Sequence, residues 1–141
     1  MSQDENKALV ERFVSEFWSN GKVSTADELM AADATIVVNN QAVPGIEALK
    51  GFCHSLREAF PDWHSTFEEL VIEGDRVAER WTGRGTHRGT FQGIPATGRH
   101  VAVPGTVFYR IVDGKITEFR GQFDRLAMLE QLGSTAMPST A

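Results

Sequence analysis

A glycine-rich stretch, RGTHRGTFQGIPATGRH at residues 84–100, is the first segment of this chain whose residue types could carry chemistry. A dinucleotide-binding fingerprint has three glycines in the pattern G-x-G-x-x-G, and the glycines here do not have the spacing that this pattern requires between the second and the third. Arg99 and His100 stand where a phosphate-binding loop has Lys and then Ser or Thr. We expect a strand after this stretch, so no helix N-terminus would meet a phosphate. The stretch therefore predicts a loop between two strands, shaped in part by Pro95.

Metal binding and nucleophilic catalysis have weak support in the sequence. His54, His64, His87 and His100 follow no metal-ligand spacing, and there is no cysteine pair. Cys53 falls on the apolar face of an expected helix, which is typical of a small core residue. No G-x-S-x-G elbow presents a serine. We expect neither a metal nor a cofactor.

Acid–base chemistry remains, and Asp124 is the first candidate for it. Along residues 115–124, the side chains of Glu118, Arg120, Gln122 and Asp124 alternate onto one face of an expected strand. Such a polar face is either solvated or the lining of a polar cavity. Asp124 itself could cap the helix that follows or act as a general base.

His87 is the second candidate. It shares a strand phase with Trp81 and with Glu79, which could pair with it. A histidine in that position is either a partly buried residue with a hydrogen-bond partner or a member of a catalytic site. The pattern alone leaves both readings open.

The elements that must position these residues fall into two halves. Apolar residues at helical spacing predict a helix from Leu9 to Trp18, a short helix from Thr25, and a third helix from Ile46 to Phe60 that Pro61 ends. Ser2 and Glu5 could form a capping box at the start of the first helix. A short strand, ATIVVNN, ends near Asn39 between the second and third helices.

The second half reads as strands. Four strands are expected in WHSTFEELVIE, RVAERWTGRGTH, RHVAVPGTVFYRIV and KITEFRGQF, with a hairpin turn at Asp113-Gly114. DRLAMLEQLG then reads as a short closing helix that Gly133 ends. Helices followed by antiparallel strands predict an α+β fold.

Composition sets the class of protein. The 141 residues carry a formal charge of −5, which argues against nucleic acid or an anionic membrane as a partner. The N-terminus predicts no signal peptide, no apolar run is long enough to cross a membrane, and the lone cysteine suits the cytoplasm. We expect one domain over 1–133 and a disordered tail over 134–141. Both faces of the strands carry apolar residues, which predicts a homodimer and leaves a higher oligomer open.

Several of these segments together resemble one family. The quoted motifs are FPDWH (60–64), G-T-H-x-G (85–89), G-x-P-x-T-G-R (93–99), R-x-x-x-G-K-I (110–116) and DRLAMLEQLG (124–133). In this combination the chain resembles the SnoaL-like polyketide cyclases of the nuclear-transport-factor-2-like superfamily. The resemblance covers about residues 60–133.

The resemblance implies a cone in which a strongly curved antiparallel sheet wraps around the N-terminal helices, with a central pocket and a short closing C-terminal helix. It also implies a cyclase that closes a ring in a hydrophobic or polyketide-like small molecule. The reaction would be an intramolecular aldol condensation that uses carboxylate acid/base chemistry and no cofactor.

Site residues follow from the same resemblance. The family's catalytic aspartate matches Asp124, and His87 of the G-T-H motif would assist it. We assign substrate binding to six further residues: Arg120, Gln122, Trp81, Trp63, His64 and Phe108. Relatives commonly have tryptophan at the position of Arg120, so this arginine sets the chain apart. It could pair with Glu118, weaken Asp124 as a base, or bind an anionic substrate group.

Two other functions stay open. An epoxide-hydrolase-like or isomerase-like enzyme would use Asp124 together with Arg120. A non-catalytic module of the same fold would bind a small ligand or mediate dimerisation only.

Overall fold

The computed structural model describes residues 2–133 and confirms the α+β fold. The expected tail, 134–141, lies outside the described residues. The helices are α1 (Gln3–Phe13), α2 (Thr25–Leu29), α3 (Ile46–Ala59) and α4 (Arg125–Gln131), and a π-helical segment, η1 (Val14–Ser19), continues α1. The strands are β1 (Met30–Val38), β2 (Gln41–Ala42), β3 (His64–Glu73), β4 (Arg76–Thr86), β5 (His100–Val112) and β6 (Lys115–Phe123).

The strands form one curved sheet in the order β2-β1-β6-β5-β4-β3. From β6 to β3 every pair is antiparallel, as expected. The short strand β1, for which the sequence predicts no partner, pairs with β6 in parallel. β1 and β6 are far apart in the chain, so no hairpin turn fixes their relative direction. The sequence pattern carries no signal for such a pairing.

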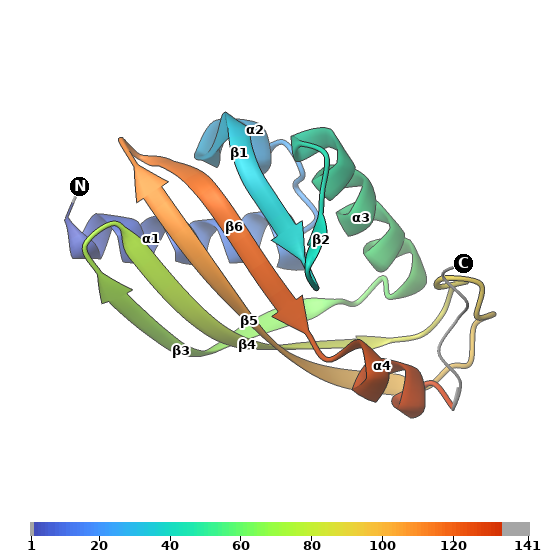
Figure 1. The fold of residues 1–141 in the computed structure, drawn as a ribbon. Helices are drawn as coiled ribbons and strands as arrows, with labels where there is room; N and C mark the ends of the chain where they lie inside the picture. The colour runs from blue at the N-terminus through green and yellow to red at the C-terminus, as the bar shows by residue number, and fades with distance from the viewer. Residues whose placement is uncertain (1, 134–141) are drawn as a thin grey trace.

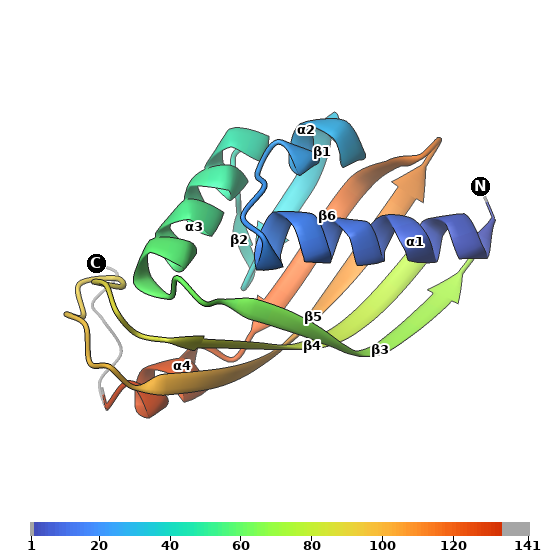
Figure 2. The same ribbon diagram turned by 180° about the vertical axis from the view of Figure 1, so that it is seen from behind.

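The helices α1, α2 and α3 lie on the concave side of the sheet (Figures 1 and 2). The strand pattern explains this arrangement. In β5 the odd-numbered residues from Val101 to Ile111 are buried, and the even-numbered residues face outward and are exposed except the partly buried Arg110. Among residues 2–133, the helices therefore cover one face of the sheet and leave the other uncovered. No helix among residues 2–133 is long and apolar enough to cross a membrane.

The first helix begins as the sequence predicts and ends differently. Ser2 and Glu5 form the expected capping box at its N-terminus. The expected single helix changes to a π-helical turn at Val14, which the 3.6-residue spacing of the apolar residues does not reveal. The apolar face of α1 continues into η1, since Phe13 and Phe17 are both fully buried and their rings stack. Trp18 lies within this wider turn and borders the cavity described below.

Two glycines on the concave face allow tryptophan rings to lie directly against the backbone. A Cβ atom on Gly83 would lie 2.1 Å from Cζ2 of Trp63, and a Cβ atom on Gly105 would lie 2.2 Å from Cζ2 of Trp81. Real carbon atoms do not approach so closely, so any side chain at these positions would displace the indole rings. The glycines thus fix how far the aromatic walls stand from the sheet.

Candidate functional site

An enclosed apolar cavity lies between the concave face of the sheet and the helices. It takes residues from η1, α3, α4 and from five of the strands. The empty space between its lining residues is about 650 Å³, a figure that includes solvent at its open mouth. The location agrees with the central pocket that the sequence predicts.

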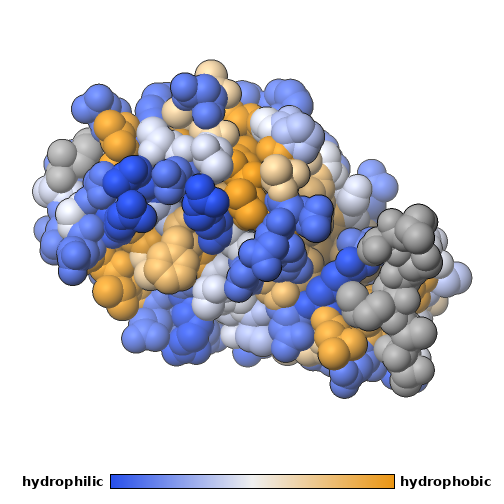
Figure 3. Space-filling view, viewed as in Figure 1, coloured by the Kyte–Doolittle hydropathy of each residue, from blue (hydrophilic) through white to orange (hydrophobic). Residues whose placement is uncertain are grey.

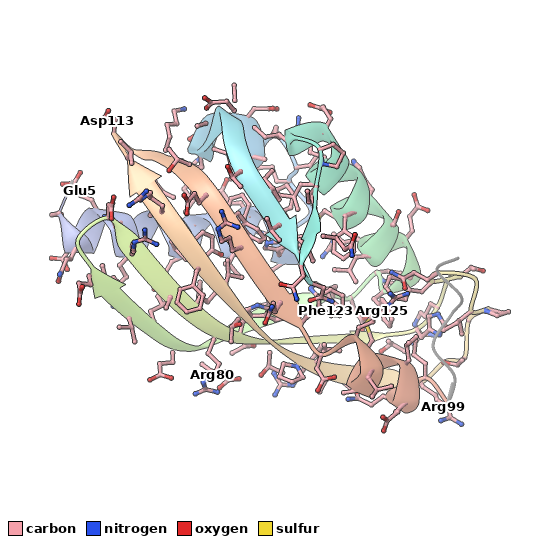
Figure 4. The ribbon with its side chains drawn as sticks, in the orientation of Figure 1. Glu5, Arg80, Arg99, Asp113, Phe123 and Arg125 are labelled. Atoms are coloured by element: carbon pink, nitrogen blue, oxygen red, sulfur yellow. The ribbon has the colours of Figure 1, made fainter. Side chains whose placement is uncertain are left out.

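Aromatic rings make most of the cavity wall. The rings belong to Trp18, Phe52, Trp63, Trp81, Phe91, Phe119 and Phe123. These include all three tryptophans of the chain. Phe123 lies at the end of β6, near the tip of the β1–β2 hairpin (Figure 4), where its backbone N–H donates to Asn39 Oδ1 over 2.9 Å. Such a wall suits a flat, largely apolar ligand.

Glu79 is the one carboxylate among the described residues that line the cavity. It lies on β4 in the inward phase, between the fully buried Val77 and the partly buried Trp81, and is itself only 3% exposed. Its Oε1 accepts a hydrogen bond of 2.7 Å from the Tyr109 hydroxyl, whereas its Oε2 has no partner. Burial raises the pKa of Glu79 to about 7, against a smaller lowering by the Tyr109 hydroxyl.

Tyr109 approaches Glu79 from the neighbouring strand. Val77 pairs with Tyr109 and Glu79 pairs with Val107, so the two polar side chains are diagonal neighbours on one face of the sheet. Burial raises the pKa of Tyr109 well above its usual value, and the nearby Glu79 carboxylate raises it further. The phenol therefore remains a hydrogen-bond donor throughout the neutral range.

The other polar groups of the cavity wall are Ser65 and Gln122. The Ser65 hydroxyl accepts a hydrogen bond of 3.2 Å from Nε1 of Trp63. The Gln122 amide donates to Asn40 Oδ1 over 3.3 Å. Three of the expected binding residues, Trp63, Trp81 and Gln122, therefore do line one cavity.

Asp124 does not line this cavity. Its carboxylate is the N-cap of α4, where Oδ1 accepts a hydrogen bond of 2.9 Å from the N–H of Ala127. Its side chain is exposed and borders a shallow depression on the outer face, together with Arg80 and Thr106. Figure 4 shows Arg80 pointing away from the sheet. Of the polar side chains on this face of β6, Arg120 and Asp124 are thus solvated, whereas Gln122 borders the cavity.

His87 is fully buried but also lies outside the cavity lining. Its Nδ1 accepts a hydrogen bond of 3.2 Å from the N–H of Thr97, and its ring stacks on Phe60 with centroids 5.2 Å apart. Burial lowers the pKa of His87. The residue ties the start of the glycine-rich loop to its end, and its expected partner Glu79 bonds to Tyr109 instead.

The remaining expected binding residues are on the surface. Arg120 is exposed, and its Nε lies 3.7 Å from Glu118 Oε2, which is the pairing that leaves Asp124 free of it. His64 is exposed at the start of β3, and Phe108 is 58% exposed on the outer face of β5. The structure therefore does not bring Asp124, His87 and Arg120 together around one space.

Cys53 is a core residue, as expected. Its Sγ donates to the Phe17 carbonyl over 3.3 Å, and burial raises the pKa of this thiol to about 11. Within residues 2–133, no three histidine, cysteine or acidic side chains form a group that could hold a metal ion.

Glu79 and Tyr109 were not predicted from the sequence as a site, although the strand phase of each residue indicates that it is buried. Glu79 is a carboxylate in the buried phase of a strand, between Val77 and Trp81. Tyr109 is the one tyrosine of the chain and lies in the buried phase of the next strand. A buried carboxylate needs a partner, so the pair could have been predicted from their phases.

Comparison with known proteins agrees with this geometry. A family model described as SnoaL-like polyketide cyclase matches residues 8–132. The aklanonic acid methyl ester cyclase DnrD of Streptomyces peucetius is 32% identical over 130 residues, a match that covers 89% of this chain and 88% of DnrD.

Solved structures show the same fold. A protein of Jannaschia sp. CCS1 that is assigned to the SnoaL-like polyketide cyclases superimposes with a TM-score of 0.84 and 31% identity, over 96% of this chain and 95% of that one. AclR of Streptomyces galilaeus, which is assigned as a hydroxylase, superimposes with a TM-score of 0.86 and 29% identity, over 94% and 98%. The motifs of the second half, the curved sheet with its cavity and the family match over most of the chain lead to one assignment: this protein belongs to the SnoaL-like polyketide cyclases.

Proposed function

We propose that the protein closes a ring in a polyketide-like carbonyl compound by an intramolecular aldol reaction inside the aromatic cavity. The observation that carries the proposal is the enclosed cavity itself, which has aromatic walls and a single carboxylate among its described lining residues. The similarity of the chain to DnrD supports a polyketide-like substrate.

The chemistry needs little beyond what the cavity offers. Carbon between two carbonyl groups is already acidic, so a positioned carboxylate is a sufficient base. A narrow cavity with rigid walls holds a flexible chain in a folded shape that brings its two reacting carbons together. Exclusion of water strengthens hydrogen bonds to the enolate oxygen. A cofactor-independent reaction is consistent with these needs.

Two carboxylates are candidates for the base. The family resemblance proposes Asp124, with His87 as its helper and Arg120 as a substrate contact. The cavity proposes Glu79, which borders the space where a ligand would bind. Variants of Asp124 and Glu79 separate the two assignments.

Incubation of the purified protein with aklanonic acid methyl ester, the compound in the name of DnrD, tests the function. We expect a product of unchanged mass, because an intramolecular aldol closure rearranges atoms without adding or removing any. In water labelled with oxygen-18, an incorporated label would instead support the epoxide-hydrolase-like alternative. Binding without any conversion would support the non-catalytic module.

A matched pair of variants places the reaction in the cavity. Leu56 lines the cavity and is 5% exposed, whereas Leu126 lies on α4 and is 49% exposed. We expect Leu56→Trp to fill the cavity and to abolish turnover, while Leu126→Trp leaves turnover unchanged. Equal turnover by a folded Leu56→Trp protein and the wild type would place the reaction elsewhere.

We also propose that the protein forms a homodimer in the cytoplasm through the outer face of the sheet. Val71, Ala78 and Phe108 pair in register across three neighbouring strands and form an apolar row on that face. Val71 is 56% exposed and Phe108 is 58% exposed. Figure 3 shows apolar surface between the charged groups of this face. A second copy of the chain would cover the row, since both copies offer the same apolar surface.

A further inference from the structure

The buried carboxylate of Glu79 has one satisfied oxygen and one without a partner. Oε1 accepts the hydrogen bond from Tyr109, and Oε2 is buried with no hydrogen-bond partner among residues 2–133. A buried polar atom without a hydrogen-bond partner destabilises the fold, so such atoms are rare unless they have a use. Because Glu79 borders the cavity, a ligand inside it is the available partner for Oε2.

We propose that Glu79 is the catalytic carboxylate of this protein and that Tyr109 is its positioning residue. The inference rests on the proposed ring closure and names the group that moves the proton in it.

Tyr109 is built to hold Glu79 in one orientation. Its side chain is almost fully buried, and its ring packs edge-on against Phe119 with centroids 5.5 Å apart. Its hydroxyl has Glu79 as its hydrogen-bond partner at 2.7 Å. A donor held this firmly fixes Oε1 and prevents free rotation of the carboxylate. Oε2 is then the oxygen that remains for a ligand.

The surroundings of Glu79 set its proton affinity through burial rather than through charge. The residues that η1 and α3 contribute to the same cavity are Val14, Trp18, Phe52 and Leu56, which carry no charge. Besides burial, the Tyr109 hydroxyl is the one group within residues 2–133 that shifts the pKa of Glu79. A pKa of about 7 allows the same group to accept a proton and to return it near neutral pH.

The step balances within one substrate molecule. Oε2 of the ionised Glu79 takes the proton from a carbon between two carbonyl groups, and the electron pair of that C–H bond forms an enolate. The enolate carbon forms a bond to a second carbonyl carbon of the same molecule, whose π electrons move to its oxygen. That oxygen then takes the proton back from Glu79. No oxidant, reductant or water is consumed.

A carboxyl titration of the ligand-free protein tests the site without any substrate. In protein labelled with carbon-13 at glutamate Cδ, we expect one carboxyl resonance to titrate near pH 7, while ordinary glutamates titrate near pH 4.3. The resonance should be missing in Glu79→Gln. In Tyr109→Phe it should titrate at higher pH, since the donor that lowers the pKa of Glu79 is gone. If no glutamate of the wild-type protein titrates above pH 6, the inference is overturned.

Turnover then tests the catalytic role. We expect Glu79→Gln to lower kcat by about 100-fold or more, the usual effect of removing a general base. Tyr109→Phe should lower kcat with little change in KM and should move the acid limb of the kcat/KM profile to higher pH. A merely structural role for Tyr109 would lower activity equally at all pH values.

Asp124→Asn is the variant to compare with Glu79→Gln, because it separates the two candidate bases. If the wild type converts the substrate and Glu79→Gln does so equally well, Glu79 is not the catalyst and the proposed function stands. If Asp124→Asn rather than Glu79→Gln abolishes turnover, the base is Asp124. If the titration behaves as expected but the wild type closes no ring in any carbonyl substrate, the proposed function fails while Glu79 is retained as a ligand-facing carboxylate.

Discussion

Two carboxylates of this chain have opposite surroundings, and their contacts indicate what each does. Asp124 is exposed, and its Oδ1 accepts a backbone N–H of α4. Glu79 is buried, and its Oε2 has no partner. A helix cap works best with an acceptor that is always available, whereas a base needs an oxygen that the protein leaves unbonded. The geometry assigns the first role to Asp124 and favours the second for Glu79.

The capping role of Asp124 gives a prediction at the scale of a single residue. We expect Asp124→Ala to lower the free energy of unfolding by about 1 kcal/mol, because the N–H of Ala127 loses its acceptor. Asparagine caps as well as aspartate does, so Asp124→Asn should unfold like the wild type. Urea unfolding measures both variants. An unchanged Asp124→Ala protein would show that the cap contributes nothing to stability.

At the scale of elements, the concave face of the sheet is shaped by glycines as much as by large side chains. Gly83 lies under the ring of Trp63, and Gly105 lies under the ring of Trp81. These contacts set the depth of the cavity between the sheet and η1. Strand β4 therefore contributes both the carboxylate and a platform for the aromatic wall beside it.

A pair of glycine substitutions tests this arrangement. In Gly83→Ala the new methyl group would lie 2.1 Å from the Trp63 ring, so we expect a loss of about 1–3 kcal/mol in the free energy of unfolding. Gly51 lies in the middle of α3 with open space around its Cα, so Gly51→Ala should raise the same quantity by about 0.5–1 kcal/mol. Thermal and urea unfolding measure both. The opposite signs make the comparison decisive, and a neutral Gly83→Ala would show that Trp63 moves freely.

The elements also show where sequence patterns stop being informative. The capping box at Ser2, the end of α3 before Pro61 and the Asp113-Gly114 turn are local, and each was predicted from neighbouring residues. A local pattern of apolar residues did not reveal two features. One is the parallel pairing of β1 with β6, which are far apart in the chain, and the other is the π-helical turn after Phe13.

The same distinction applies to the site. Trp81, which the family resemblance suggested as a binding residue, does line the cavity, because it lies in the inward phase of β4. On β6 the alternation was also read correctly, but it cannot say which face of the sheet the helices cover. Asp124 and Arg120 were therefore expected in a pocket, and the structure places them on the outer face. These two residues lie in or next to a family motif in the sequence, but they do not line the cavity.

At the scale of the whole molecule, the sheet has a covered face and a bare one. The apolar row of Val71, Ala78 and Phe108 crosses the bare face. A charge placed in the middle of this row would oppose its burial by a second copy.

The dimer is tested by sedimentation. We expect the wild type to sediment with about twice the 15.6 kDa mass of one chain, and Phe108→Lys to sediment as a single chain. Leu126→Lys, at an exposed apolar residue that lies on α4 and not in this row, should behave as the wild type. A Phe108→Lys protein that keeps the double mass would show that the subunits meet elsewhere.

The three tryptophans have a practical consequence because all of them border the same cavity. Indole emission depends on the polarity and the quenchers next to the ring, so nearly all of the protein's intrinsic fluorescence originates at the place where a ligand would sit. The tryptophan emission of the unlabelled protein is therefore expected to change when a ligand binds. A library of candidate compounds can be screened against the unlabelled protein, without knowledge of the reaction, by following the colour and intensity of that emission.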